Sequence, residues 1–498
     1  MDGSPYTVTA PQSRCRLGVA RADITPPADI YQRMWGAARH DRAEGIHRPL
    51  TATVLYMAQL EPGGGEPLVL IALDHCLLYR REAEAVTAQA MAAAHAAQPS
   101  LGLEPQSLLL AFSHTHAAGL MAWDRSHLPG GERIRPYLAE MATKIGQAIA
   151  AAAQAAQPAT LVYGTGRCAL AAHRDLWDER SGQFVCGFNP AGPADDTVLV
   201  ARATADDGRL LATVVNYACH PTTLAWDNRL ISPDFPGAMR ETVEAATGAP
   251  CIFLQGASGD LGPREGFVGD VAVADRNGRI LGHAATAALE SLPPPGTRFE
   301  YTGPVISGAT IGTWGYQPLD AAAQATAATW QLRQWELPFP CREDLPTVEE
   351  VQAQREQWLV REDEARRSGD NAAAADARAL IERADRMLSR LSVLAGRREF
   401  PYLVRLLKLG DAFWLAVPGE PYQHLQVQLR QRFPGVAIVV MGLAGGWGPS
   451  YLPPREVYGR GIYQESIALL APGSLERLIE AAGDAIEAML APQHTPAG

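Results

Sequence analysis

The sequence predicts a mixed α/β protein in which one large domain has a β-sheet core, surrounding helices and an inserted helical hairpin. Short apolar runs typical of buried strands alternate with Ala-rich segments typical of helices, as expected for a sheet covered by helices. Candidate functional residues lie from His114 to Tyr451. This spread favours a single domain over residues 1–498, although about 150 residues per domain would also allow three.

Composition excludes several classes of protein. The chain has 498 residues, of which 47% are hydrophobic and 19% charged, as in ordinary globular proteins. The formal net charge of −11 argues against a nucleic-acid partner, because binding to phosphates needs an excess of Lys and Arg. No apolar run reaches the roughly 18 residues that would span a bilayer, so we expect no membrane anchor.

The N-terminal half begins with strands and continues with alternating helices and strands. Glycines at 63–65 separate two apolar runs and predict a hairpin, because glycine accepts the positive φ of a tight turn. The predicted strands are at 17–27, 51–60, 67–74, 107–116, 159–168, 197–205, 209–221 and 249–260, and the predicted helices are at 81–99, 137–158, 235–247 and 276–292. Polar residues at the strand ends are expected to gather at one edge of the sheet.

A charged segment over 318–399 interrupts this alternation. Its apolar residues recur at helical spacing on both sides of Ser368-Gly369-Asp370, and Gly369 can end the first helix in a left-handed conformation. We therefore expect an antiparallel helical hairpin inserted into the domain. A solvated hairpin without chemistry is the simpler interpretation, and a lid or an oligomer contact is the alternative. Strands at 402–420 and 436–448 and a helix at 473–491 complete the chain.

Two histidines stand close together in Ser113-His114-Thr115-His116. Residues two apart on a strand share a face, so His114 and His116 are expected to point into one cleft. Imidazole suits Zn²⁺, so the pair is a candidate metal site, and two unrelated polar histidines are the alternative.

A third histidine, His220, precedes Pro221 after an apolar run. Proline keeps the residue before it extended, which is expected to project the His220 ring from the sheet edge. Cys219 would face the other way on a strand, and we predict that it is a core residue.

Glu420 and a Gly- and Tyr-rich loop follow two further strands. Glu420 lies in Pro-Gly-Glu-Pro after the apolar run FWLAV. Without other evidence, a glutamate in this position is more typical of a turn residue than of a metal ligand. The loop after VAIVVM contains several glycines but no following GK[ST], so a phosphate-binding loop is not supported.

Several motifs together resemble those of the neutral/alkaline, non-lysosomal ceramidase family. They occur in the family's order from about Leu17 to about Glu465, and they are GVARADITPP, MWGAARHDRAEGIHRPLTATVLYM, FSHTHAAGL, NYACHPT, FLQGASGDLGP, VPGE and YLPPREVYGRGIYQE. The resemblance implies a zinc amidohydrolase domain with one Zn²⁺ per chain. The motif matches imply that the metal ligands are His114, His220, Glu420 and Tyr451.

The same matches imply that His116, Arg174 and Tyr463 surround the scissile amide and stabilise charge there. His116 as a further zinc ligand is the main rival assignment. Arg174, with its planar fork of donors, would suit a carboxylate or another polar group of the substrate. Asp23 and Asp74 could orient histidines, and a plain capping role is the alternative for both.

Two departures from the family matter. The position of the family's active-site serine corresponds to Gly256, which disfavours a serine nucleophile and leaves Ser258 as the remaining candidate. We also expect no C-terminal β-sandwich domain, which ranks ceramide below more soluble amides as a substrate.

The expected function is hydrolysis of the C–N bond of an N-acyl or related amide by metal-activated water. The alternatives are a zinc esterase, lactonase or carbamate hydrolase, and a non-catalytic zinc-binding scaffold. Seven scattered cysteines without a CxxC pair and no visible secretory signal favour the cytoplasm. A homo-oligomer is compatible with the sequence.

Overall fold

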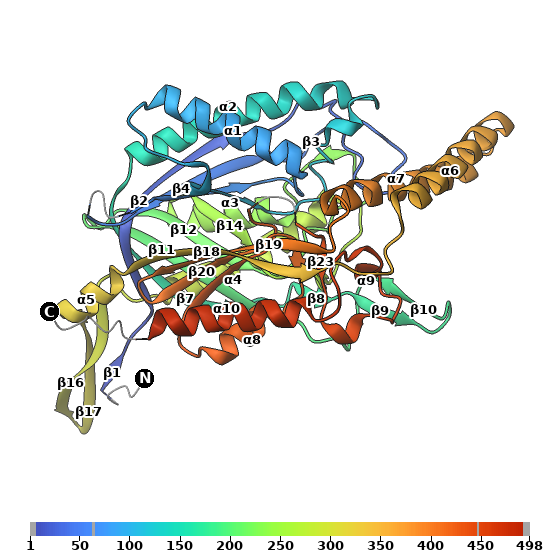
Figure 1. The fold of residues 1–498 in the computed structure, drawn as a ribbon. Coiled ribbons are helices and arrows are strands. Elements are labelled where there is room, and N and C mark those ends of the chain that lie inside the picture. The colour runs from blue at the N-terminus through green and yellow to red at the C-terminus, as the bar shows by residue number, and fades with distance from the viewer. Residues whose placement is uncertain (1–5, 62–64, 446–447, 492–498) are drawn as a thin grey trace.

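Two β-sheets pack face to face between helices in a computed structural model that describes residues 6–61, 65–445 and 448–491 (Figure 1). The shared core contains Leu55 and Leu70 from the larger sheet and Leu407 and Trp414 from the smaller one. Side chains alternate between the two faces of a strand, so each sheet also buries its outer face under helices. The molecule therefore has four layers, in the order helix, sheet, sheet, helix.

The larger sheet is mixed and has the strand order β14-β12-β11-β7-β2-β4-β5-β6. Its β5–β6 and β12–β14 pairs are parallel and the other pairs are antiparallel. In chain order the strands are β2 (Gln12–Asp23), β4 (Thr51–Ala58), β5 (Leu68–Leu73), β6 (Leu108–Phe112), β7 (Gln157–Arg167), β11 (Thr197–Ala205), β12 (Leu210–Tyr217) and β14 (Cys251–Gln255).

This sheet twists so strongly that its two edges approach each other. Strand β14 at one edge comes close to β5 and β6 at the other. Twist of one hand accumulates over successive strands, and eight strands suffice to bend the sheet this far. The loops that follow β6, β12 and β14 are thereby brought to one region.

Two helix pairs cover the outer face of the larger sheet. Helices α1 (Arg80–Ala97) and α2 (Ile134–Gln154) pack on β4 and β5 through residues such as Val54 and Ile71. Helices α3 (Phe235–Thr247) and α4 (Val271–Glu290) pack on β7, β11 and β12. All four were predicted; α2, expected to reach residue 158, ends at Gln154 because β7 begins at Gln157.

The smaller sheet has the order β18-β19-β20-β22, formed by Trp330–Pro340, Glu399–Leu409, Ala412–Ala416 and Ala437–Met441. Helices α8 (His424–Arg432) and α10 (Ser474–Leu490) cover its outer face. The predicted fold class, a mixed α/β domain with helices around a sheet core, is confirmed.

The helical hairpin is shorter than the predicted segment 318–399. It consists of α6 (Val348–Ser368) and α7 (Asn371–Leu394), which pack on each other, and Gly369 between them has the expected left-handed φ of 76°. The earlier part of the segment contains the short helix α5 (Ala321–Ala327) and strand β18, which pairs with β19 along its whole length. Alternating residues in β18 were hidden by the charged composition around them.

A second hairpin, β16 (Thr297–Ser307) and β17 (Ala309–Pro318), extends from the body of the molecule and pairs with β1 (Thr7–Val8) (Figure 1). The sequence did not predict it. The expected turn between β4 and β5 does join an antiparallel pair; Gly63 and Gly64 lie outside the described residues. None of the described helices combines the length and apolar character required to cross a bilayer.

Candidate metal centre and active site

Four of the predicted site residues come together from segments far apart in the chain. His114 lies two residues after β6 and His220 three residues after β12. Glu420 belongs to β21 (Glu420–Pro421), which pairs in parallel with β23 (Tyr451–Leu452) so that Glu420 is opposite Tyr451. This two-residue ladder places a carboxylate and a phenol beside the two histidines.

Backbone carbonyls fix the orientation of both imidazoles. Nδ1 of His114 lies 2.8 Å from the carbonyl oxygen of Cys76, and Nδ1 of His220 lies 2.7 Å from that of Ser258. A carbonyl can only accept, so Nδ1 of each ring donates this hydrogen bond and Nε2 is the nitrogen that remains for a metal ion. This is the arrangement found behind metal-binding histidines.

Both Nε2 atoms face the same carboxylate oxygen. Oε2 of Glu420 lies 2.9 Å from Nε2 of His220 and 3.3 Å from Nε2 of His114. Each of the three residues offers one ligand atom, and these three atoms lie within 4.8 Å of one another. His114, His220 and Glu420 therefore form a buried group of donors suited to holding one metal ion.

The electrostatics of this group follow from burial and from its neighbours. Burial, aided by the Arg174 charge, lowers the pKa of His220 to about 3, so this ring is neutral at physiological pH. Burial by itself would favour a neutral Glu420, but His114 and His220 hold the pKa of Glu420 well below its usual value. Burial would lower the pKa of His114, but Cys76 and Glu420 raise it well above its usual value. Binding of a cation would therefore release a proton from this ring and leave neutral imidazoles beside an ionised carboxylate.

His116 and Tyr451 border the same group. Nε2 of His116 lies 3.4 Å from Nε2 of His114, and the Tyr451 hydroxyl lies 3.4 Å from Nε2 of His220. Burial and the neighbouring histidines lower the pKa of His116 well below its usual value. His116 also combines with Cys76 and His114 in a second cluster of potential ligands, which keeps its rival assignment as a metal ligand open.

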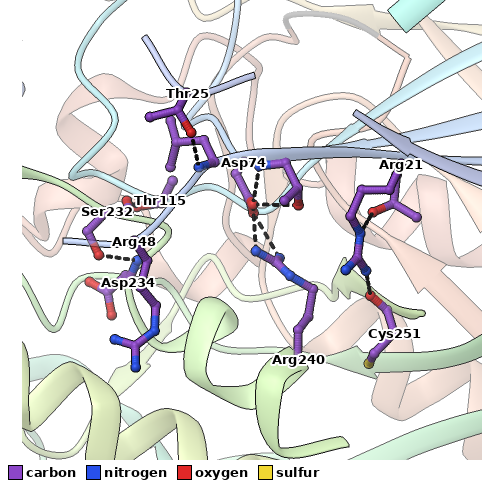
Figure 2. A network of polar contacts seen from close by, with 12 residues as sticks. Arg21, Thr25, Arg48, Asp74, Thr115, Ser232, Asp234, Arg240 and Cys251 are labelled. Carbon is purple, nitrogen blue, oxygen red and sulfur yellow. Dashed lines mark hydrogen bonds and ion pairs between the residues drawn. The ribbon is translucent and has the colours of Figure 1, made fainter. Parts of the chain in front are cut away.

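The two histidines of the SHTH motif share a cleft for a reason different from the expected one. Strand β6 ends at Phe112, and His114 adopts a φ of 69°, a left-handed conformation that non-glycine residues rarely adopt. Between them Thr115 is anchored on the far side, where its hydroxyl donates to the carbonyl of Ser232 at 2.7 Å (Figure 2). A tight loop, not strand alternation, turns His114 and His116 toward each other.

Arg174 is buried behind Tyr451. Its guanidinium carbon lies 5.2 Å from the centre of the Tyr451 ring, and Nη2 donates to the Gly259 carbonyl at 2.6 Å. Burial raises the pKa of Tyr451 well above its usual value, and the Arg174 charge opposes this increase. Arg174 is thus placed to hold the Tyr451 ring and to favour the ionised form of its hydroxyl.

Gly256 and Ser258 both lie in tightly packed surroundings. A Cβ at Gly256 would lie 2.8 Å from Oε1 of Gln426 and 3.0 Å from Cβ of Ala218, so a side chain there would require these neighbours to shift. The Ser258 hydroxyl accepts from Nε2 of Gln255 at 2.6 Å. Ser258 contributes its carbonyl to the site, as the acceptor for His220.

Two expectations about other residues have clear outcomes. Cys219 is fully buried in the core beneath α3 and α4, as predicted. Asp74 does not orient a site histidine: it receives a two-pronged hydrogen bond from Arg240 at 2.9 and 2.6 Å and also binds Thr51 (Figure 2). Asp23 accepts from the backbone of Thr25 in a local turn. Both aspartates have the capping or bracing role.

A small pocket of about 100 Å³ opens onto the candidate metal centre. His114, His116, Glu420 and Tyr451 line it, together with the half-exposed Tyr463, whose ring centre lies 6.1 Å from that of Tyr451. Apolar side chains complete much of the wall, and these are Met34, Trp35, Leu77, Leu120, Leu443 and Ile467.

The sequence did not indicate three polar contributors to this site. Cys76 supplies the carbonyl that accepts the hydrogen bond from His114. Its position after β5 could have indicated this, because β5 and β6 are parallel neighbours and the residues that follow them lie at the same edge of the sheet. Arg386 and Arg390 of α7 also line the pocket. In the sequence they belong to a charged helix and nothing distinguishes them from solvated residues.

Comparison with solved structures identifies similar folds. A ceramidase solved in complex with C2 superposes with a TM-score of 0.63 at 18% sequence identity, over 98% of this chain and 77% of its own. Neutral ceramidase from Pseudomonas aeruginosa gives a TM-score of 0.62 at 19% identity, over 99% of this chain and 77% of its own. No family model matches the sequence, and no curated protein matches it either. The chain therefore has the fold of the neutral ceramidases.

Proposed function

From this fold and these histidines, we propose that the chain hydrolyses the C–N bond of an amide with the help of one zinc ion held by His114, His220, Glu420 and Tyr451. The observation that carries the proposal is the pair of imidazoles whose Nδ1 atoms are tied to carbonyls and whose Nε2 atoms face one carboxylate oxygen. In the two similar structures named above, the same fold belongs to ceramidases.

The donor set fits zinc. Two neutral imidazoles, a carboxylate and a phenolic oxygen are ligand types that Zn²⁺ accepts in four-coordinate sites. When bound in such a site, zinc lowers the pKa of a coordinated water toward about 7 and polarises a carbonyl oxygen. Arg174 would support this set by holding the Tyr451 ring and by favouring the ionised phenol, which is the better ligand.

His116 and Tyr463, which are not proposed as ligands, would transfer a proton and donate a hydrogen bond during the reaction. Hydrolysis adds the oxygen of water to the carbonyl carbon, breaks the C–N bond and delivers a proton to the amine nitrogen. We assign the proton transfer to His116, because its Nε2 lies beside the ligand atoms. Tyr463, at the edge of the pocket, would donate a hydrogen bond to the oxygen that gains negative charge.

The pocket favours a compact acyl group. Its volume of about 100 Å³ is well below the several hundred Å³ typical of sites for larger ligands, and apolar side chains form part of its wall. We therefore rank amides with a short or compact acyl group above ceramide.

We also propose a cytoplasmic location. All seven cysteines lie within the described residues and are free thiols. Unpaired cysteines persist in a reducing compartment.

Metal analysis and a substrate panel test the function together. Protein purified without added metal should contain about one zinc per chain, and His220→Ala and Glu420→Gln should lose both zinc and activity. The panel pairs N-acyl amino acids and ceramides with the corresponding esters and lactones, and amides should turn over fastest.

Ser258→Ala is the matched control, because it keeps the carbonyl that holds His220, and it should retain zinc and activity. Absence of zinc would overturn the metal assignment. Bound zinc with no turnover of any amide would instead favour the scaffold, and faster turnover of esters would favour the esterase.

A further inference from the structure

Two arginines of the inserted hairpin reach the pocket of the candidate active site. Arg386 and Arg390 of α7 line it together with Glu420 and Tyr451. Building on the proposed function, we propose that the amide substrate carries a carboxylate and that Arg386 and Arg390 bind it at the entrance formed by the hairpin.

The geometry of α7 makes the two residues act together. They are four positions apart on a 24-residue helix, a spacing that places side chains on the same face one turn apart. Both side chains are half-buried. Burial raises the pKa of Tyr79 at the start of α1, and both guanidinium charges oppose this increase. Two positive charges are therefore held close to the same wall of the pocket.

These charges lack an acidic partner. Within the described residues, neither Arg386 nor Arg390 has a carboxylate oxygen within 4.0 Å, and Nε of Arg386 is buried without a hydrogen-bond acceptor. Two other arginines of the hairpin are paired, since Arg378 binds Glu382 and Arg355 binds Asp385. Partly buried guanidinium groups without a partner are costly unless a ligand completes them.

The missing partner has a defined chemistry. A guanidinium presents a planar fork of donors that matches a carboxylate in a two-pronged contact. The same pocket is also lined by apolar side chains such as Met34, Leu120 and Ile467, which suit the uncharged part of the molecule. An amide with a carboxylate on its amine part or on its acyl part satisfies both conditions.

Matched substrates test the proposal and distinguish its two forms. N-acetylphenylalanine and N-acetylphenylalaninol differ only in the carboxylate of the amine part. The N-phenethyl amide of succinic acid and N-phenethylbutyramide differ in the carboxylate of the acyl part. One acid should be hydrolysed with a kcat/KM about tenfold to a hundredfold above that of its neutral partner, the range expected for a hydrogen bond to a charged group.

Variants on α7 assign the effect to the arginines. Arg386→Gln with Arg390→Gln should abolish the preference, so that kcat/KM for the acid falls about tenfold to a hundredfold, to the level of the neutral amide. Arg383→Gln is the matched control, because Arg383 lies on the same helix but is exposed and does not line the pocket. It removes one positive charge and should keep the preference.

The outcomes separate this proposal from the proposed function. If wild-type protein hydrolyses the acid and the neutral amide equally well, or if the double variant retains the preference, the carboxylate site is wrong and amide hydrolysis stands. If neither kind of amide is hydrolysed, the proposed function fails, and the carboxylate site falls with it. Turnover of the neutral amide by the double variant also shows that the variant is folded.

Discussion

Asp234 connects the histidine loop to the core through a single buried carboxylate. Its oxygens accept hydrogen bonds from the backbone of Leu224 at 2.9 Å and of Phe235, the first residue of α3, at 2.6 Å. The backbone of Asp234 has a φ of 57°. Two residues earlier, the carbonyl of Ser232 accepts a hydrogen bond from the hydroxyl of Thr115 (Figure 2). Burial raises the pKa of Asp234 to about 6.

This raised pKa predicts a pH-dependent contribution of Asp234 to stability. The unfolded carboxyl titrates near 3.9, so between about pH 4 and pH 6 the folded protein binds more protons than the unfolded chain. The free energy of unfolding of the wild type, minus that of Asp234→Asn, should therefore fall as the pH rises through this window. Denaturant titrations of both proteins at pH 4.5, 5.5 and 7 measure this difference. A difference that is constant or that rises with pH would contradict the prediction.

The hairpin helix α7 is fixed to the domain by a buried cluster of charges. Arg125, which is 2% exposed, pairs with Glu382 at 2.8 Å and with Asp385 at 3.2 Å. Glu382 is 1% exposed and also binds Arg378. One turn further along the helix stands Arg386, so this cluster sets where α7 meets the pocket.

Removing the central carboxylate should destabilise the protein strongly. Glu382→Gln leaves the buried Arg125 with Asp385 and the more distant Asp124, and breaking a buried ion pair typically costs about 3–5 kcal/mol. We expect a loss near the lower end of this range in denaturant-induced unfolding. Glu362→Gln is the control, because Glu362 pairs with the exposed Arg366 within α6 and should cost less than about 1 kcal/mol. Equal losses would show that the Arg125 cluster does not anchor the hairpin.

The sequence predicted well those elements that have a clear local pattern of apolar residues. Helices α1 to α4 and the strands of the larger sheet combine strong apolar runs with clear breaks at Gly or Pro. Strand β18 and the β16–β17 hairpin were missed because they expose much of their surface, which weakens the alternation of apolar residues. The proximity of α7 to the pocket depends on tertiary packing alone, and no local pattern encodes it.

At the scale of the whole molecule, the candidate metal centre joins both sheets. His114 and His220 follow strands of the larger sheet, whereas Glu420 follows β20 of the smaller one. Each residue was recognisable from the sequence because it ends a buried run within a motif of the resembled family. The tight loop at His114 and the curl of the sheet, which make their side chains converge, were not recognisable, because they depend on contacts between distant segments.

A metal bound at this junction should stabilise the entire domain. A ligand that binds only the folded state raises the free energy of unfolding according to its concentration and affinity. Treatment with a chelator should therefore lower the Tm in calorimetry, and added zinc should restore it. His220→Ala is the control, and its Tm should not respond to either treatment. A wild-type Tm insensitive to both would contradict a metal held between the sheets.

The curl of the larger sheet also bears on self-association. Its edge strands β6 and β14 approach each other, and this leaves little open edge on which a second chain could add a strand. The extended β16–β17 hairpin has no such protection: among the described residues β17 pairs only with β16, and the apolar Ile306 at its tip is 87% exposed. Aggregation of the folded protein by strand addition would therefore begin at β17, far from the chemistry of the pocket.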